Sequence, residues 1–247
     1  MVLPTMFCDM NHNPYICKKN ILMETDCSLC SFMPTAESKL NACQLKTLTD
    51  NHIVVSFKKG DSIIKQGAYS TNVIFLRKGL VKIHITGPYS EQIVKLAKPP
   101  TYLGLPTTFG AKINHYSITA LENCEVCFID VSIFRELLRD SEHFNYEIIQ
   151  SLCRYELESF RRCVNRTQKL TRGNLADVLL DFANNFFNSE SFTLPISQSE
   201  IGHLIDTTRE SVSRMLSEFE RDGVIRMTGK QLEITDRKAL ERISQTG

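Results

Sequence analysis

The 247-residue chain has almost no net charge, no long apolar run and no low-complexity tract. Its 29 Lys and Arg residues nearly balance 28 Asp and Glu residues, so the molecule as a whole does not attract nucleic acid. No stretch approaches the roughly 18 apolar residues of a membrane-spanning helix, and the first residues do not resemble a secretion signal. These absences favour an ordinary globular protein, which we expect in the cytoplasm.

Catalytic patterns are missing from the sequence as well. No nucleophile, base and orienting residue form a recognisable group, and no phosphate-binding loop is present. The sequence therefore does not point to an enzyme.

Short apolar runs separated by turn residues fill the segment from residue 52 to about residue 130. These runs are rich in Val and Ile, and glycines such as Gly60, Gly67 and Gly79 separate them. Short strands at such regular spacing predict an antiparallel sandwich or roll. The predicted strands lie in HIVVSF, SIIKQG, VIFLRKG, LVKIHI and QIVKLA.

Helical periodicity replaces this pattern after Asp130. The stretch from about Glu142 to Thr167 contains neither Gly nor Pro, which predicts a helix of roughly 25 residues. Such a helix, standing clear of a β-domain, most often pairs with its own copy, so we expect a homodimer; the alternative is a helix that lies back on its own domain. The expected seam has spacings of three and four: Ile148, Leu152, Tyr155, Ser159, Arg162 and Arg166.

The most informative segment begins at Ser197. Ser197 and Glu200 have the spacing of a capping box, and the apolar residues that follow predict a short helix ending near Asp206. Thr207 and Glu210 form a second candidate capping box, so we expect the next helix to begin near Thr208. Its buried stripe is predicted to be Val212, Met215, Leu216 and Phe219, and its exposed face Arg209, Glu210, Ser213 and Arg214.

Two short helices with a tight turn are typical of DNA readout in the major groove. Arg donates two hydrogen bonds to guanine and Glu accepts one from cytosine. After Gly223, VIRM and QLEI flank Thr228-Gly229-Lys230 and predict a hairpin wing. We therefore predict a winged helix-turn-helix that binds double-stranded DNA through Ser199, Thr208, Arg209, Glu210, Ser213 and Arg214.

Two observations leave an alternative open. Residues 169–247 carry ten Lys and Arg against twelve Asp and Glu, whereas DNA-binding domains are usually basic. Glu210 could cap its own helix and the arginines could be solvated surface residues. The competing hypothesis is an effector-binding or redox-sensor module whose helix-turn-helix serves only as a protein interface.

From about residue 45 to its end, the sequence resembles the Crp/Fnr family of transcription regulators. The resemblance rests on FKKGDSIIKQG, VIFLRKGLVKI and SQSEIGHLIDTTRESVSRMLSEFERDGVI, in that order. It implies an α+β fold, a homodimer on a two-fold symmetric site, and RNA polymerase as a partner. The implied parts are a Cys-rich extension (1–44), a cyclic-nucleotide-binding-type β-roll (45–138), a dimerisation helix (139–168) and a winged helix-turn-helix (169–247).

Family members read DNA with two related residue sets. Arg209, Glu210 and Arg214 match the positions of the cAMP-binding member, whereas Glu210, Ser213 and Arg214 match those of the anaerobic regulator. The half-site therefore stays open. The cAMP-binding members hold the nucleotide with Gly-Glu and Arg-Ser pairs, and this chain has Leu105 and Asn114-His115 there. Without a cationic partner for the phosphate, we do not expect cAMP to bind.

The resemblance also implies a use for the cysteines. The anaerobic regulator holds an oxygen-sensitive [4Fe–4S] cluster with three N-terminal cysteines and one β-roll cysteine that follows an Ala-Leu-Glu triplet. The matching residues give a hypothetical cluster on Cys17, Cys27, Cys30 and Cys127. The family's closely spaced third cysteine is missing, because nine residues separate Cys17 from Cys27.

Alternatives for the cysteines remain. A zinc site or a dithiol switch could use the Cys27-Cys30 pair, or no metal binds and the β-roll takes an unknown small ligand or none. Cys124 and Cys127 are three residues apart, so on a strand they face opposite ways and cannot share a site; Cys124 is expected in the core. We expect Cys153 and Cys163 to be packing or surface thiols.

Overall fold

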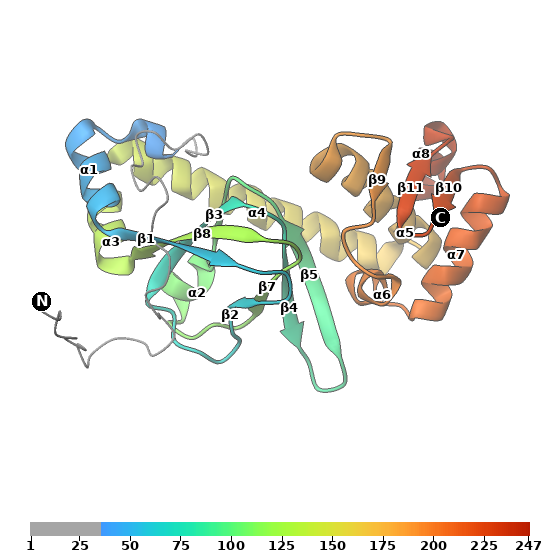
Figure 1. Ribbon diagram of the computed structural model, residues 1–247, viewed down its shortest axis with the longest axis horizontal. Coiled ribbons are helices and arrows are strands. Elements are labelled where there is room, and N and C mark those ends of the chain that lie inside the picture. Colours follow the sequence, from blue (N-terminus) through green and yellow to red (C-terminus); the bar gives the residue numbers. More distant parts are fainter. Residues whose placement is uncertain (1–35) are drawn as a thin grey trace, which may run out of the picture.

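The computed structural model describes residues 36–247 and shows a β-rich domain and a mainly helical domain joined by one long helix, α4 (Figure 1). The strands of the first domain are β1 (His52–Phe57), β2 (Ser62–Ile64), β3 (Asn72–Lys78), β4 (Val81–Thr86), β5 (Glu91–Ala97), β6 (Thr101–Leu103), β7 (Ser117–Ala120) and β8 (Cys124–Asp130). The helices up to the junction are η2 (Glu37–Lys39), α1 (Ala42–Asp50), α2 (Leu105–Gly110), α3 (Val131–Asp140) and α4 (Glu142–Gln168). The five predicted runs all contain strands, β1 to β5.

The strands form two four-stranded antiparallel sheets. Their orders are β1-β8-β3-β6 and β2-β7-β4-β5, so β5 is an edge strand of the second sheet. Side chains such as Leu76, Ile118 and Val126 fill the core between the two sheets. The alternation of side chains along these strands therefore produces the predicted roll.

Strand β8 shows how this alternation separates two cysteines. Cys124 is buried in the core between the sheets, as expected. Cys127 is also buried, but it lies three residues further on and pairs with Val54 and Phe75. Neighbouring Ile129 belongs to a second cluster, under the helices. The two thiols thus lie on opposite faces of one strand.

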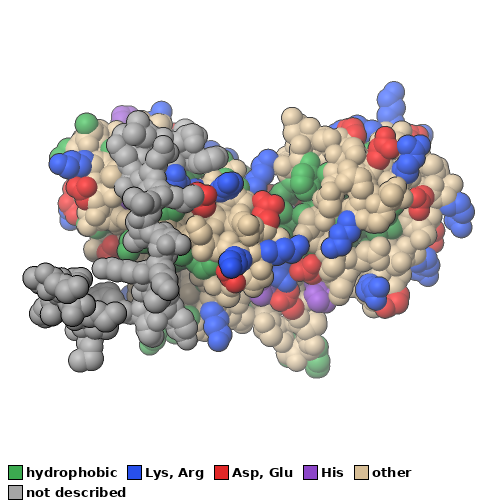
Figure 2. Space-filling model, in the orientation of Figure 1, with side chains coloured by type: hydrophobic (Ala, Val, Ile, Leu, Met, Phe, Trp, Pro, Cys, Tyr) green, Lys and Arg blue, Asp and Glu red, His purple; other side chains and the backbone are tan. Residues whose placement is uncertain are grey.

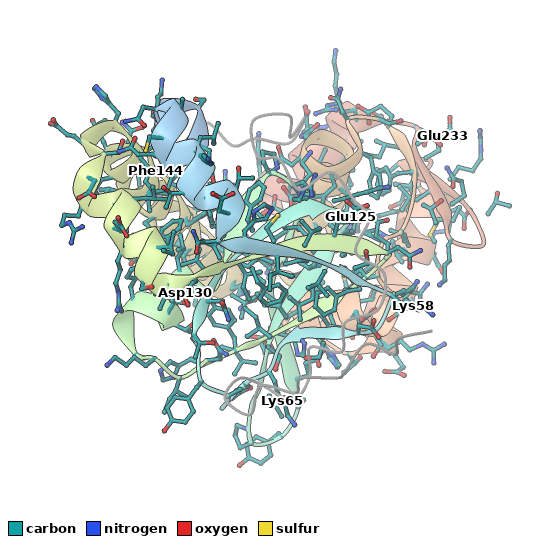
Figure 3. All side chains as sticks on the ribbon, turned by 60° about the vertical axis from the view of Figure 1, so that its left-hand side comes forward. Lys58, Lys65, Glu125, Asp130, Phe144 and Glu233 are labelled. Carbon is teal, nitrogen blue, oxygen red and sulfur yellow. The ribbon has the colours of Figure 1, made fainter. Side chains whose placement is uncertain are left out.

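Helices α1, α3 and the first part of α4 cover the outer face of the first sheet. Phe134 and Phe144 are fully buried there, and their ring centroids are 5.3 Å apart in an edge-to-face arrangement. Phe144 lies close to where these helices meet (Figure 3). This aromatic cluster fixes the start of α4 to the β-domain.

Helix α4 is 27 residues long and is capped by Ser141, whose hydroxyl accepts a hydrogen bond from the backbone N–H of Phe144. One face lies along its own domain. Ile148 is buried there, and the hydroxyls of Tyr155 and Thr101 are 2.6 Å apart. Arg166 donates a hydrogen bond to the carbonyl oxygen of Ile93.

The predicted pairing seam is partly covered by its own domain. Four of its six members lie on the side of α4 that packs on the β-domain: Ile148, Tyr155, Arg162 and Arg166. This is what the alternative, a helix lying back on its own domain, requires. Leu152 of the predicted seam is exposed, but most of the exposed apolar side chains of α4 form a separate stripe. We call it the α4 stripe: Tyr146, Ile149, Cys153, Leu157, Phe160 and Val164. At about 3.6 residues per turn, the stripe lies half a turn away from the seam.

The C-terminal domain is built on one core that includes Leu175, Ile201, Phe219 and Leu232. Its elements are α5 (Thr171–Asp181), a π-helical turn η3 (Phe182–Phe187), β9 (Ser191–Thr193), α6 (Gln198–Ile205), α7 (Arg209–Arg221), β10 (Ile225–Thr228), β11 (Gln231–Ile234) and α8 (Arg237–Thr246). The expected α+β fold, with a β-roll, a long helix and a winged helix-turn-helix, is confirmed. Among the described helices, none has the length and apolar character to cross a membrane.

Candidate nucleic-acid interface

Helix α6 begins at the predicted capping box. The Ser197 hydroxyl accepts a hydrogen bond from the Glu200 N–H at 3.2 Å, and Glu200 Oε2 accepts one from the Ser197 N–H at 3.0 Å. The helix ends at Asp206, whose φ of 62° places it in the left-handed region. This residue breaks the helix and turns the chain toward α7.

The turn between α6 and α7 is unusually tight at Gly202. The Thr207 N–H donates a hydrogen bond to the Gly202 carbonyl oxygen at 2.9 Å. A Cβ atom at position 202 would lie 2.6 Å from the Thr207 carbonyl oxygen, which is closer than such atoms approach. Glycine is therefore needed for the two helices to meet at this angle.

Helix α7 begins one residue later than predicted. Thr208, not Thr207, is the N-cap, and its hydroxyl accepts a hydrogen bond from the Ser211 N–H at 3.2 Å. The predicted box of Thr207 and Glu210 is thus wrong, because the left-handed Asp206 delays the start of the helix. Glu210 becomes the second residue of α7, and the position from which a side chain closes a capping box belongs to Ser211.

The two faces of α7 divide as predicted. Its apolar stripe is buried: Val212, Met215, Leu216 and Phe219. On the other side, the four predicted residues are exposed and line one depression together with Ser217: Arg209, Glu210, Ser213 and Arg214. We call these five residues the reading face. Sequence reasoning missed Ser217, although it lies four residues after Ser213 and so occupies the same side of the helix.

Arg214 is only loosely held within the reading face. Its Nε lies 4.0 Å from Glu218 Oε1, and 74% of its side chain is exposed. At that separation and exposure, the ion pair contributes little to stability. The guanidinium is therefore available to a ligand.

Two other predicted contact residues lie apart from the depression. Thr208 uses its hydroxyl to cap α7 and to donate to the Ser211 hydroxyl. Ser199 is half-buried in the first turn of α6. The structure therefore brings together four of the six predicted residues. The other two, Thr208 and Ser199, lie at or near the N-termini of α7 and α6.

The predicted wing is present as the hairpin of β10 and β11. The strands pair from Ile225 with Ile234 to Thr228 with Gln231, and the turn between them exposes Lys230. Acidic and basic side chains are interspersed on the visible face of this domain (Figure 2). Arg226, for example, donates a hydrogen bond to Glu233 across the wing at 2.9 Å. The face seen in Figure 2 therefore shows no broad basic field.

The loop that would hold a cyclic nucleotide is closed by its own hydrogen bonds. Leu105 is buried at the start of α2. Asn114 is buried too; its Oδ1 accepts a hydrogen bond from the Thr107 hydroxyl at 3.0 Å, and its carbonyl oxygen accepts one from the Gly67 N–H at 2.8 Å. His115 is exposed. The positions that match the Gly-Glu and Arg-Ser pairs of the cyclic-nucleotide binders thus carry Leu105, which is apolar, and Asn114, whose amide is already hydrogen-bonded within the protein.

The candidate metal ligands can be placed only in part. Cys17, Cys27 and Cys30 lie outside the described residues, whereas Cys127 is buried on β8. Within residues 36–247, no three His, Cys, Asp or Glu side chains gather as a metal site would need. Cys153 and Cys163 are exposed on α4 and are therefore surface thiols.

Two family models match the chain. The Crp-like helix-turn-helix domain covers residues 173–243, and the cyclic nucleotide-binding domain covers residues 54–141. The first match contains the reading face, and the second contains the β-roll.

Individual proteins are similar to the chain over most of its length. The transcriptional activator protein FnrA of Stutzerimonas stutzeri is 26% identical over 186 residues, which span 72% of this chain and 75% of FnrA. The CRP-like cAMP-activated global transcriptional regulator of Mycobacterium tuberculosis is 25% identical over 207 residues, 80% of this chain and 91% of that protein. The structure of FixK2 from Bradyrhizobium japonicum shares the fold, with a TM-score of 0.72 at 18% identity over 79% of this chain and 98% of FixK2.

Proposed function

This chain belongs to the Crp/Fnr family of transcription regulators, and we propose that it binds a two-fold symmetric DNA site as a homodimer, with the N-terminus of α7 in the major groove. Its homologues are DNA-binding transcription regulators, a class distinct from enzymes. By family resemblance, RNA polymerase is the expected protein partner.

The reading face is the observation that carries this proposal. Arg209, Glu210, Ser213 and Arg214 lie together on the exposed side of α7, while its other side is anchored in the core. Arg side chains can donate two hydrogen bonds to a guanine, and Glu210 can accept one from a cytosine. Because Ser211 holds the capping position, Glu210 is not needed to cap α7. This weakens the alternative that Glu210 serves to cap its own helix.

A homodimer is the second part of the proposal. The α4 stripe exposes large apolar side chains, with Leu157 66% and Phe160 59% exposed. Apolar residues at spacings of three and four along a long helix fit a second copy of the same helix. Since residues 169–247 carry more Asp and Glu than Lys and Arg, affinity for DNA would depend on pairing two sets of base and phosphate contacts.

For the signal, we propose an effector other than cAMP. The phosphate of a cyclic nucleotide needs a charged donor in its pocket. Leu105 and Asn114 provide none, and the Asn114 amide oxygen already accepts from Thr107. A relative activated by cAMP therefore does not imply the same ligand for this chain.

The cysteines are the candidate sensor. We propose that Cys17, Cys27 and Cys30 join Cys127 around an iron–sulfur cluster, with zinc or a dithiol switch at Cys27 and Cys30 as the alternatives. Cys127 lies on the face of β8 opposite the Cys124 core. The test is purification without oxygen, followed by a visible spectrum and iron and zinc analysis. A colourless, iron-free protein excludes the cluster, and a Cys127→Ser variant should lose the iron.

DNA reading has its own experiment. The wild-type protein is used to select duplexes from a random pool, and Kd is then measured by fluorescence anisotropy at fixed salt. Arg214→Ala should weaken binding to the selected duplex by about 1–3 kcal/mol. Arg221→Ala is the matched control for the loss of one charge, because Arg221 is exposed in the last turn of α7, about two turns beyond Arg214, and does not line the depression. Failure to enrich a symmetric sequence, or equal Kd values for Arg214→Ala and wild type, contradicts the proposal.

A further inference from the structure

A polar joint connects the β-roll to the helix-turn-helix. Lys82 of β4 lies at its centre: its Nζ donates to Glu91 Oε1 at 2.8 Å and to Glu200 Oε1 at 3.0 Å. Glu91 belongs to the same hairpin as Lys82, whereas Glu200 lies 118 residues away on α6. One ammonium group thus bridges the two domains.

This ammonium group is largely removed from water. Only 12% of the Lys82 side chain is exposed. Burial opposes its charge, but hydrogen bonds to Glu91 and Glu200 outweigh that effect and raise the pKa of Lys82. Glu200 cannot swing away freely, because its second oxygen accepts hydrogen bonds from the N–H and hydroxyl of Ser197. The ion pair therefore holds the N-terminus of α6 at one place on the β-roll.

Backbone contacts extend the joint along α6. Gln92 of β5 donates a hydrogen bond to the carbonyl oxygen of His203. Arg166, in the last turn of α4, donates through Nη2 to the carbonyl oxygens of Ile93 and Leu204, each at 3.0 Å. Since β5 is the edge strand of its sheet, α6 lies against that edge (Figure 1). We call this set of interactions, made by Lys82, Glu91, Gln92, Arg166 and Glu200, the α6 clasp.

We propose that the α6 clasp sets the angle at which α7 is presented to DNA, with Lys82 as a positioning residue in the sensor domain. The tight contact between Gly202 and Thr207 makes α6 and α7 move together, so fixing α6 also fixes α7. None of the clasp residues belongs to the reading face, which stays open. The clasp therefore orients the reading face without covering it. This inference rests on the proposed function.

Its effect on DNA binding follows from symmetry. Two α7 helices in a dimer must match half-sites about 34 Å apart, one helical turn of DNA. Apart from the clasp, the domains share apolar packing, since Leu80, Ile93, Leu96 and Leu121 of the β-roll belong to the cluster that forms the C-terminal core. At the end of α4, Lys169 Nζ also donates to Asp177 Oδ2 at 2.6 Å. Apolar packing is non-directional, so without the clasp the C-terminal domain can shift on this surface. A domain that shifts still binds one half-site but loses part of the gain from binding both.

The experiment compares Lys82→Met with Lys78→Met in the full chain. Lys78 is a matched control, because it also lies on the β-roll but is exposed and pairs within its own sheet with Glu125, at 4.0 Å. Two duplexes serve as probes: the symmetric one selected by the wild-type protein, and the same duplex with one half scrambled. Lys82→Met should weaken binding to the symmetric duplex about tenfold and leave binding to the single half-site unchanged. Lys78→Met should change neither.

Hydrogen–deuterium exchange supplies a readout that does not depend on DNA. Lys82→Met should speed exchange in β5 and α6, and Glu200→Gln should do the same, since its amide oxygen can still cap α6. Unchanged exchange in both variants overturns the clasp. Equal or tighter binding of Lys82→Met to the symmetric duplex, or an equal loss on both duplexes, overturns its positioning role. If even the wild-type protein enriches no duplex, the proposed function fails, while exchange still decides whether the clasp exists.

Discussion

Gly202 packs directly against the carbonyl oxygen of Thr207, so that a Cβ atom at position 202 would meet this oxygen at 2.6 Å. The contact lies inside the turn that connects α6 to α7. Every residue of the reading face is therefore placed by a backbone approach that only glycine allows.

We expect Gly202→Ala to destabilise the C-terminal domain by about 1–3 kcal/mol, because the added methyl group must push the turn apart. The same change should weaken DNA binding, since α7 shifts with the turn. Thermal unfolding and anisotropy measure the two effects. Gly110→Ala is the control, because a Cβ atom at Gly110 meets nothing within 4 Å. Equal stability of the two variants would contradict the assigned role of Gly202.

Arg166 gives a second stability prediction. Replacing it with Met leaves the carbonyl oxygens of Ile93 and Leu204 without their charged donor. Hydrogen bonds to charged groups contribute about 1.5–3 kcal/mol, so the urea midpoint should fall measurably. Arg161→Met, at an exposed position on the same helix, should leave the midpoint unchanged. A midpoint equal to that of wild type in Arg166→Met would mean that these contacts add nothing to stability.

Local sequence patterns were sufficient to predict the strands β1 to β5 and the buried face of α7. Runs such as HIVVSF and LVKIHI are bounded by turn residues and alternate between faces, so their strands could be predicted. In α7, Val212, Met215 and Phe219 recur with helical spacing while charged residues occupy the other side. In both cases the spacing of the apolar residues fits only one kind of element: alternation fits a strand, and spacings of three and four fit a helix.

Where two local solutions compete, the sequence could not decide. On α4, one seam contains Ile148 and Tyr155 and the other contains Leu157 and Phe160, and only packing on the β-roll determines which is covered. Thr207 and Thr208 are equally suited to cap a helix, and the conformation of Asp206 selects the second. The link from Lys82 to Glu200 spans 118 residues and leaves no local pattern.

The α4 stripe leads to a prediction about assembly. Phe160→Glu should shift the protein toward a monomer, since burying a carboxylate between two apolar helices is costly. Ser159→Glu is the control, because it adds the same charge at the neighbouring exposed position on the other side of α4. Light scattering coupled to size-exclusion chromatography gives the mass of each variant. If wild type is already monomeric, or if Phe160→Glu remains dimeric, the stripe is not the dimer interface.

Cys124 allows a prediction about thiol reactivity. The side chain is buried, and burial raises the pKa of its thiol, which lowers the fraction of reactive thiolate. Cys153 lies exposed on the α4 stripe. In the folded protein, iodoacetamide should therefore label Cys153 much faster than Cys124, as measured by peptide mass spectrometry. Protection of Cys153 at high protein concentration, lost in Phe160→Glu, would independently place this thiol in the dimer interface.

Glu37 should make stability fall as pH rises. Its side chain is only 4% exposed, and burial raises its pKa from 4.5 to about 8. Between these two values, the folded state keeps a proton that the unfolded state has lost. The free energy of unfolding should therefore decrease by about 1.4 kcal/mol for each pH unit in this window, and by nothing further above it.

A Glu37→Gln variant cannot titrate at this position, so its stability should lack that part of the slope. The two proteins should differ little at the acidic end of the window and increasingly toward pH 8, with the variant gaining relative to wild type. Urea unfolding at several pH values measures the slope. Glu136→Gln, at an exposed position on α3, corrects for the loss of a surface charge. Parallel pH profiles for wild type and Glu37→Gln would mean that Glu37 is ionised in the folded protein, and that water or a cation reaches its carboxylate.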